Sequence, residues 1–242
     1  MTELLQCCGL SKSFGNITVA EDIDFSIARG EAVGIIGPNG AGKTSLFNLI
    51  TGTLQPNSGS IRFQQQDITR LNSAARCHSG IARSFQIPQP FSAMSVYENA
   101  LVAATHGAKL GASEAEDRSI DALRKTGLLA QANSVAGSLT LLERKRLELT
   151  RALASNPNLL LLDEIAGGLT DKECQSLIET IQQIHAEGVT IIWIEHIVHA
   201  LMAVVDRLIV LEFGKIIADG EPATVMASKI VQENYMGISA DA

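Results

Sequence analysis

Excess positive charge, a metal-type cysteine pattern and a long unbroken apolar run are all missing from this 242-residue chain. Lys and Arg total 19 against 26 Asp and Glu, a net charge of −7, which argues against a nucleic-acid partner. No C-x-x-C pair and no zinc-type histidine spacing occurs. We therefore interpret the cysteines as reduced thiols of a cytosolic protein: Cys7, Cys8, Cys77 and Cys174.

Membrane and export signals are also missing. No charged-then-apolar leader with a cleavage site opens the sequence, so we expect no export. The longest late apolar stretch, "IVHALMAVVDRLIVLEF", is interrupted by His199, Asp206 and Arg207 and is too short to span a bilayer. If the protein works at a membrane, other chains must supply the passage.

Short β-branched or leucine-rich runs alternate with segments of helical period. The runs are "EAVGIIG" (31–37), "LLLL" (159–162) and "VTIIWIEH" (189–196). Such alternation predicts an α/β fold with a mainly parallel sheet. The turn-rich stretch 54–68 differs, and with residues 4–15 and 20–31 it predicts an antiparallel β flank. With 46% hydrophobic residues the chain can bury a large core, and we expect one domain over 1–242.

Helical pattern dominates residues 88–150, with an exposed loop expected at "KLGASEAED" (109–117). We interpret 88–150 as a helical subdomain inserted into a core made of 1–87 and 151–242. The sequence shows no internal repeat and no low-complexity tract.

A phosphate-binding pattern stands between a predicted strand and a predicted helix. "GPNGAGKT" fills every fixed position of G-x-x-x-x-G-K-[ST]. Glycines let the backbone wrap closely around phosphate oxygens, and the helix adds its positive N-terminal end. Lys43 can reach the β- and γ-phosphates, and the Thr44 hydroxyl can ligate Mg²⁺. We predict a nucleotide-binding loop at Gly37, Pro38, Asn39, Gly40, Ala41, Gly42, Lys43, Thr44 and Ser45.

Two adjacent acids, Asp163 and Glu164, end the leucine run. Acids also cap helices, so this stretch alone leaves a structural and a functional role open. The phosphate loop favours function, because in nucleotide hydrolases of this loop class an acid at the end of a buried strand holds Mg²⁺. Asp163 fits that role. Glu164 is then placed to orient a water for in-line attack on the γ-phosphate. His196 and Gln86 are not singled out by the residues around them.

These pieces, in this order and spacing, resemble the ATP-binding subunit of ABC transporters over nearly the whole chain. The resemblance implies a P-loop NTPase (RecA-like) core and ATP hydrolysis with Mg²⁺. "GPNGAGKTS" resembles the Walker A loop and "LLLLDE" the Walker B strand. By the same resemblance Phe14 stacks on adenine, Gln86 is the Q-loop glutamine with a catalytic and metal-binding role, and His196 is the catalytic H-loop histidine. "GGLT" (167–170) is similar to the D-loop.

Within the family, "GIARSFQIPQPFSAMSVYENALVA" and the C-terminal "VQENYMG" look most like ATPases of importers for branched-chain amino acids and similar polar solutes. The resemblance implies a peripheral position on the cytoplasmic face of the inner or plasma membrane. It also implies two ATPase subunits, identical or different, beneath two transmembrane permease subunits, with an external solute-binding protein and no nucleic acid.

The signature motif departs from the family pattern. Leu-Ser-Gly-Gly-Gln, which in the family closes over ATP held by the opposite subunit, is replaced by Leu139, Thr140, Leu141, Leu142 and Glu143. Thr140 keeps a hydroxyl, but two isobutyl side chains would crowd a close phosphate approach. Ile165 stands for the usual proline, Ile197 for an aspartate that is common there, and Thr170 for the usual D-loop aspartate.

Two other readings stay open beside a transport ATPase. The altered signature is also compatible with a nucleotide-binding regulatory subunit that hydrolyses ATP weakly. A soluble, non-transport ABC ATPase usually needs a coiled-coil insertion or a tandem domain, for which 242 residues leave no room. A GTPase is disfavoured, because no N-K-x-D or T-K-x-D motif follows the loop.

Overall fold

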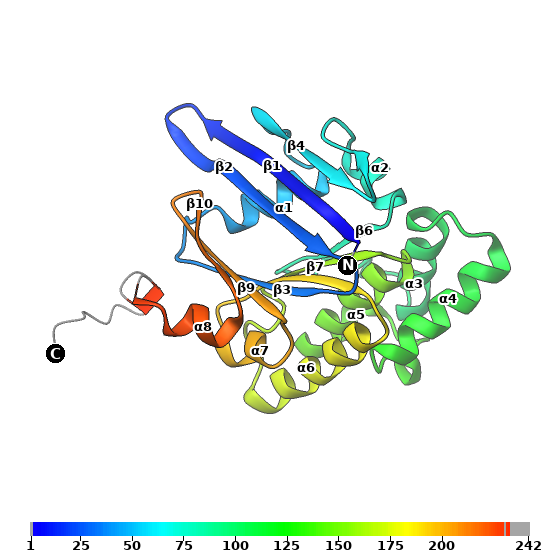
Figure 1. Cartoon of the computed structure of the whole chain (residues 1–242). Coiled ribbons are helices and arrows are strands. Elements are labelled where there is room, and N and C mark those ends of the chain that lie inside the picture. Colours follow the sequence, from blue (N-terminus) through cyan, green and yellow to red (C-terminus); the bar gives the residue numbers. More distant parts are fainter. Residues whose placement is uncertain (1, 230, 233–242) are drawn as a thin grey trace. The chain divides into compact units, whose positions relative to one another are not determined.

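A long antiparallel hairpin opens the chain, and β4 (Ser58–Phe63) lies beside it in the same sheet (Figure 1). Its strands are β1 (Glu3–Phe14) and β2 (Ile17–Ala28). Phe14 pairs with Ile17 across a two-residue turn, and Gly15 has the positive φ, 58°, that such turns need. β4 and β5 (Gln66–Asp67) extend the sheet in the order β2-β1-β4-β5, every pair antiparallel. The predicted antiparallel flank is confirmed.

The computed structural model describes residues 2–229 and 231–232, so the "VQENYMG" stretch lies outside the described residues from residue 233 on. The chain divides into two units. Unit 1 combines the residues up to Asn72 with those from Ile192 onward, and unit 2 is Ser73–Ile191. The helical subdomain limits predicted from the sequence, 88–150, stay a prediction.

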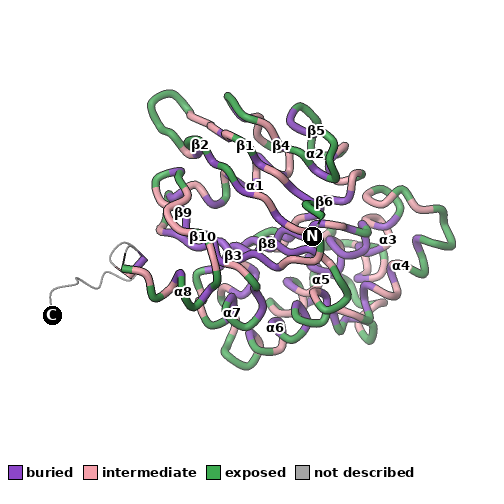
Figure 2. Tube along the Cα trace, viewed as in Figure 1, coloured by how far each residue is buried: buried purple, intermediate pink, exposed green. Residues whose placement is uncertain are grey.

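Unit 1 also holds the strand that leads into the phosphate loop. β3 (Ala32–Ile36) is buried at every residue, as Figure 2 shows along the tube. It pairs in parallel with β9 (Arg207–Glu212), which pairs antiparallel with β10 (Lys215–Gly220). Among the described residues of this unit lie the helices α1 (Lys43–Thr51), α7 (Val198–Met202) and α8 (Pro222–Ala227).

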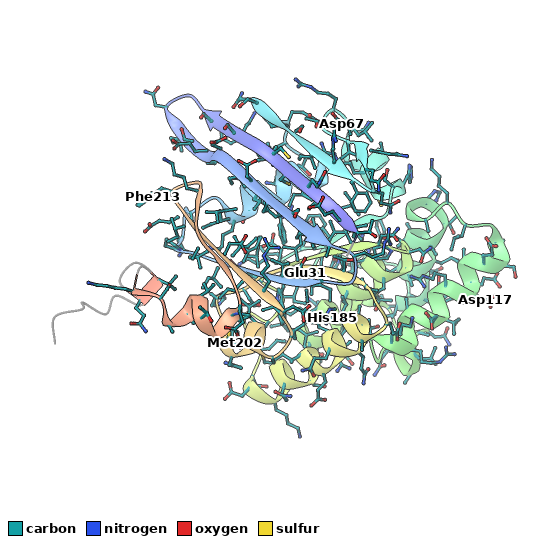
Figure 3. The ribbon with its side chains drawn as sticks, in the orientation of Figure 1. Glu31, Asp67, Asp117, His185, Met202 and Phe213 are labelled. Carbon is teal, nitrogen blue, oxygen red and sulfur yellow. The ribbon has the colours of Figure 1, made fainter. Side chains whose placement is uncertain are left out.

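A two-residue turn joins β9 and β10 and reaches the phosphate loop. Phe213, labelled in Figure 3, is 79% exposed and has a positive φ of 44°. Its neighbour Gly214 donates its backbone N–H to the Ala41 carbonyl and accepts one from Glu21. The β-hairpin tip therefore links the phosphate loop to β2 within unit 1.

Unit 2 contains a parallel strand pair and most of the helices. β6 (Ile81–Ser84) pairs in parallel with β7 (Leu159–Asp163), which is buried throughout. β8 (Thr190–Ile194), also fully buried, crosses the unit boundary. The predicted runs at 31–37, 159–162 and 189–196 are thus confirmed as strands, and the α/β class with them. The remaining elements are α2 (Ser73–His78), α3 (Val96–Val102), a π-helix η1 (Ala103–Gly107), α4 (Ala112–Lys125), 3-10 turns η2 (Leu129–Gln131) and η3 (Ala136–Ser138), α5 (Leu141–Ala154) and α6 (Asp171–Ala186).

Helices α3, α4 and α5 contact one another, and α5 also contacts β6. α4 buries Ala115, Ser119, Ala122 and Leu123, positions that share one helical face. The loop predicted over 109–117 is wrong beyond Gly111, because α4 begins at Ala112. Alanine and glutamate there are good helix formers, and their apolar face finds a partner that the local pattern does not reveal.

Candidate functional site

The phosphate loop of unit 1 needs glycine at two points of close backbone approach. A Cβ on Gly37 would lie 2.1 Å from the Leu211 carbonyl oxygen. On Gly42 it would lie 2.2 Å from the Val19 carbonyl oxygen, and Gly42 also has a positive φ of 103°. Only glycine avoids both collisions. The loop therefore owes its shape to backbone from β9 and β2.

An uncapped helix start follows the loop. α1 begins at Lys43 with Gly42 as N-cap, without a side-chain cap and without an acid in its first turn. The first N–H groups of such a helix favour an anion, and the helix dipole adds to the attraction. Lys43 donates from Nζ to the carbonyls of Gly37 (2.7 Å) and Pro38 (3.0 Å), so its ammonium is held inside the loop. Asn39, Gly40 and Thr44 are exposed.

Two further predicted residues belong to unit 1. Phe14 ends β1 with 49% of its surface exposed, and the Lys12 ammonium lies 5.2 Å from its ring centroid. His196 follows β8 and its side chain is 60% exposed. The buried Glu195 carboxylate accepts the backbone N–H groups of His196 (3.0 Å) and Ile197 (3.4 Å). Glu195 therefore shapes the turn that presents His196.

The acid pair lies in unit 2 at the end of β7. Asp163 is buried, and Glu164 has a φ of 45°, a left-handed conformation that is costly for a non-glycine residue. Gln86, after β6, donates from Nε2 to the Glu164 carboxylate at 2.5 Å. Ile165, which replaces the usual proline after Glu164, is buried in the hydrophobic core. Gln86 and Glu164, two site residues predicted independently, are therefore hydrogen-bonded to each other.

One residue that the sequence did not single out contacts this pair. Arg83 of β6 donates from Nη2 to the Asp163 carboxylate at 2.5 Å, and the two side chains are only 9% and 7% exposed. The available signal was a charged residue inside the apolar run "GIARS", before Gln86. Buried charges of this kind need a partner, but the sequence does not say which.

Side chains from two helices fix the segment after Gln86. The buried Glu148 of α5 accepts the backbone N–H of Gln89 at 2.9 Å. Arg151 donates to the Gln89 carbonyl (2.9 Å) and to Glu148 (2.8 Å), and Asn99 binds both backbone groups of Phe91. This segment is therefore tied to the helix that begins at the signature residues.

The signature residues form the start of α5, which we call closed because a capping box engages its N-cap side chain. Thr140 is the N-cap of α5, and it forms a capping box with Glu143. The Thr140 hydroxyl and backbone N–H both donate to the Glu143 carboxylate, at 2.8 and 2.9 Å. Leu139 is buried and Leu141 is 45% exposed. A Cβ on Gly168 would lie 3.4 Å from a Leu141 methyl, so this leucine lies against the "GGLT" stretch.

Thr170, in place of the D-loop aspartate, is also a helix N-cap. It forms a capping box with Glu173 at the start of α6. Hydrogen bonds from the Thr170 hydroxyl and backbone N–H hold the pKa of Glu173 below its ordinary value. Thr170 is therefore used to begin a helix.

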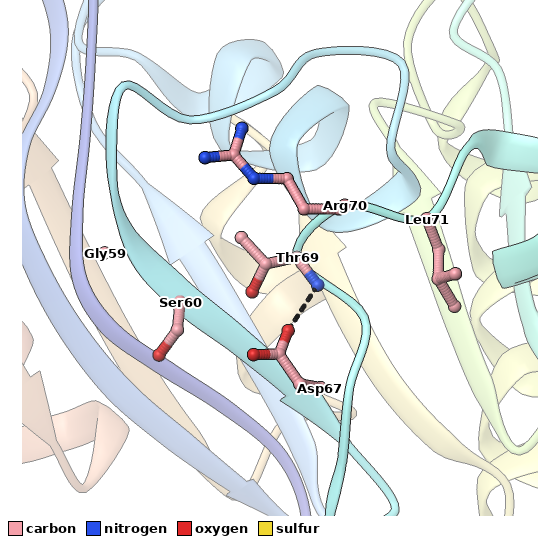
Figure 4. A pocket seen from close by; sticks show the side chains of 6 residues that line it. All are labelled: Gly59, Ser60, Asp67, Thr69, Arg70 and Leu71. Carbon is pink, nitrogen blue, oxygen red and sulfur yellow. Dashed lines mark hydrogen bonds between the residues drawn. The ribbon is translucent and has the colours of Figure 1, made fainter.

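A separate hollow of about 390 Å³ lies beside β4 and β5 (Figure 4). Asp67 accepts the Thr69 backbone N–H at 2.8 Å, and the Thr69 hydroxyl accepts that of Ile61 at 2.8 Å. These polar groups build the turn after β5. None of the predicted site residues lines this hollow.

Residues 20–167 match the model of the ABC transporter family. The chain belongs to the ABC transporter family. The high-affinity branched-chain amino acid transport ATP-binding protein LivG of Escherichia coli (strain K12) is 34% identical, over 97% of this chain and 98% of LivG. The lipopolysaccharide export system ATP-binding protein LptB of Acidithiobacillus ferridurans is also 34% identical, over 98% of each chain. A crystal structure of the ADP conformation of an ABC transporter cassette has a TM-score of 0.88 and 29% identity, covering 98% and 100% of the two chains.

The resemblance read from the sequence is thereby confirmed at the level of the family. This ABC protein is an ATP-binding subunit that binds and hydrolyses ATP. Over the described residues, no helix combines the length and the apolar character that crossing a membrane requires. The role of each site residue stays a prediction.

Proposed function

We propose that this ABC ATPase drives an importer for branched-chain amino acids or similar polar solutes. The observation that carries the proposal is the similarity to the branched-chain amino acid protein LivG over 97% of this chain and 98% of LivG. The resemblance of residues 80–103 to ATPases of such importers adds support. In this proposal it lies on the cytoplasmic face of the membrane beneath separate permease subunits. A solute-binding protein outside the membrane delivers the solute.

ATP is proposed to bind with its phosphates along 37–45 and its base against Phe14. The uncapped start of α1 and the Lys43 ammonium supply positive potential for the phosphates. His196, exposed at its turn, faces the γ-phosphate in this proposal. These assignments give each predicted residue of unit 1 one task.

Mg²⁺ fits the donor set that the described residues offer. No group of three or more His, Cys, Asp or Glu side chains forms a metal centre within the described part of the chain. Mg²⁺ needs none, because it is typically held by one or two carboxylates and the substrate phosphates. Asp163, which already holds a cation in the form of Arg83, is the proposed carboxylate, with oxygens from Thr44 and Gln86. Bound there, the metal would neutralise charge on the phosphates.

Glu164 is proposed to orient the water that attacks the γ-phosphate. Its carboxylate follows the buried Asp163, and Gln86 holds one of its oxygens. An ATP site of this family also uses the signature of a second ATPase subunit, so this chain is proposed to work as a dimer. Its closed, leucine-bearing signature favours a different subunit as partner, which would leave this chain's own loop opposite an intact glycine signature.

Uptake in reconstituted vesicles tests the proposed solute. The chain is purified together with its permease subunits and placed in proteoliposomes with ATP and the matching binding protein. ATP-dependent accumulation of labelled leucine or valine is expected. Because LptB is equally similar, lipid extraction without amino-acid uptake would overturn the importer and favour an exporter. Hydrolysis that stays weak with permeases and partner subunit present would favour the regulatory reading.

A further inference from the structure

The acid proposed to bind Mg²⁺ already carries a cation from its own chain. Arg83 Nη2 lies 2.5 Å from Asp163 Oδ2. β6 and β7 pair in parallel with Arg83 opposite Leu161, two residues before the acid, so the long guanidinium side chain runs toward the strand end. Both side chains are more than nine-tenths buried. This is a desolvated, charge-assisted contact rather than a surface ion pair.

A buried carboxylate without a counter-charge is strongly unfavourable. Arg83 supplies that charge to Asp163. An incoming Mg²⁺ requires an oxygen ligand at about 2.0 Å, and it repels a guanidinium bound to the same carboxylate. Mg²⁺ at Oδ2 would displace the guanidinium, and Mg²⁺ at Oδ1 would weaken its attraction to Oδ2, because the two cations repel each other across one carboxylate.

The surroundings of Arg83 offer the guanidinium a second contact. Its central carbon lies 5.1 Å from the centroid of the Phe85 ring, which is 51% exposed. Arg83 and Phe85 are two residues apart, a spacing that places side chains on one face of an extended chain. A cation within about 6 Å of an aromatic face is attracted to it. The guanidinium can thus leave Asp163 without losing every favourable neighbour.

We propose that Arg83 is the resting counter-ion of Asp163, and that binding of the metal with its nucleotide exchanges the guanidinium for Mg²⁺ at this carboxylate. The inference rests on the proposed role of Asp163 as the metal acid. It makes Arg83 a positioning residue that keeps the acid in place in the metal-free protein and sets the metal concentration at which the site fills. Gln86 holds Glu164 in the same segment, so one stretch, 83–86, holds both acids.

Metal affinity is the decisive measurement. Mn²⁺ binding to the full chain is followed by electron paramagnetic resonance, with a saturating non-hydrolysable ATP analogue. Arg83→Gln removes the competing charge, so Mn²⁺ affinity should rise about tenfold. Arg83→Lys keeps the charge and should stay near the parent value. Thermal unfolding of Arg83→Gln without metal should occur at a lower temperature than in the parent, because Asp163 is left with less compensation.

Two further variants keep the outcome readable. Adding Asp163→Asn to Arg83→Gln removes both charges and should recover part of the lost thermal stability, even if the single variant folds poorly. Arg207→Gln breaks an ion pair with Asp219 in unit 1, at 2.5 Å, and should leave Mn²⁺ affinity unchanged.

The results separate two failures. If Asp163→Asn weakens Mn²⁺ binding strongly while Arg83→Gln leaves it unchanged, Asp163 is the metal acid and the exchange is wrong. If Asp163→Asn has no effect on Mn²⁺ binding, the proposed role of Asp163 is itself wrong, and the exchange falls with it. Weaker Mn²⁺ binding in Arg83→Gln would also overturn the proposal, because Arg83 would then support the metal.

Discussion

Two helix starts that the family brings to ATP phosphates differ sharply in this chain. α1 begins behind the αL residue Gly42, with no side-chain cap and no acid in its first turn. α5 begins behind Thr140, whose side chain is engaged with Glu143 in a complete capping box. The first helix start has no side-chain cap, whereas at the second a capping box engages the N–H groups of Thr140 and Glu143 and adds a negative charge.

The two helix starts belong to two different tasks: the phosphate loop is proposed to bind this chain's own nucleotide, and the signature to contact the nucleotide of a second subunit. The phosphate loop keeps every glycine that its backbone contacts demand. At the signature, Leu141 is 45% exposed, and its side chain packs against Gly168 of the "GGLT" stretch. If this chain pairs with a glycine-bearing subunit, as proposed, the two ATP sites of the dimer would be unequal.

The largest effect is expected when the Lys43 ammonium at the start of α1 is removed. Lys43→Ala should lower ATP affinity by at least about 100-fold, because the ammonium is aimed at the phosphates. Nucleotide titration and ATP turnover measure the loss. Lys215→Ala is the control, since Lys215 is an exposed lysine of the same unit that pairs with Glu21. Unchanged affinity and turnover in Lys43→Ala would contradict the loop assignment.

A second variant separates ATP binding from ATP hydrolysis. Glu164→Gln keeps the shape of the side chain and removes its basic carboxylate, so turnover should fall by at least about 100-fold while ATP still binds. Dimers locked by ATP should then accumulate in size-exclusion chromatography if the closed start of α5 still grips a phosphate. Glu179→Gln, on an exposed position of α6, is the control. Turnover at the parent rate would show that another group activates the water.

Reopening the signature tests the comparison itself. Leu141→Gly with Leu142→Gly restores close backbone approach, so turnover by the purified chain alone should rise about tenfold. Leu129→Gly, at another exposed leucine of unit 2, controls for the stability cost of glycine. High turnover by the parent chain with no gain from the glycines would defeat the idea of unequal sites. The same gain on adding a glycine-bearing partner subunit would support it.

The cap of α5 has a smaller effect on stability. Thr140→Ala should lower the free energy of unfolding by about 1 kcal/mol, because the capping hydroxyl is lost. Thr170→Ala removes the equivalent cap of α6, and a similar loss is expected. Only Thr140→Ala should also change the turnover of the assembled transporter. Denaturant unfolding and ATPase assays on both variants provide the comparison, and equal effects on turnover would refute it.

The smallest effect is a pH dependence at the cap of α6. The pKa of Glu173 is lowered by hydrogen bonds from Thr170, so the carboxylate form is favoured in the folded chain. Its contribution to stability is fully present above the ordinary glutamate pKa and is lost as pH falls through the lowered folded value. The stability difference between parent and Thr170→Ala should therefore shrink in acid. Denaturant midpoints from neutral to acidic pH measure it, and a constant difference would exclude Glu173.

Local signals predicted much of the fold but not the contacts of the site. The buried strands β3, β7 and β8 were foreseen because their apolar runs are short and lack alternation. The loop expected at 109–117 failed because the partners of α4 are far away in sequence. The hydrogen bonds of Glu148 and Arg151 to the Gln89 backbone were also missed. On a helix these two residues resemble an ordinary i,i+3 surface pair.

By itself the sequence determined the phosphate loop and the order of the chemical groups along the chain. That information is local: a glycine spacing, a lysine and an acid after a leucine run are readable within a few residues. The tertiary structure alone decided which groups neutralise and hold the acids. Arg83 and Asp163 are 80 residues apart and Gln86 and Glu164 are 78 apart, and pairing of β6 with β7 brings them together. A buried carboxylate takes its counter-charge from whatever folding places beside it, and that choice is made in space.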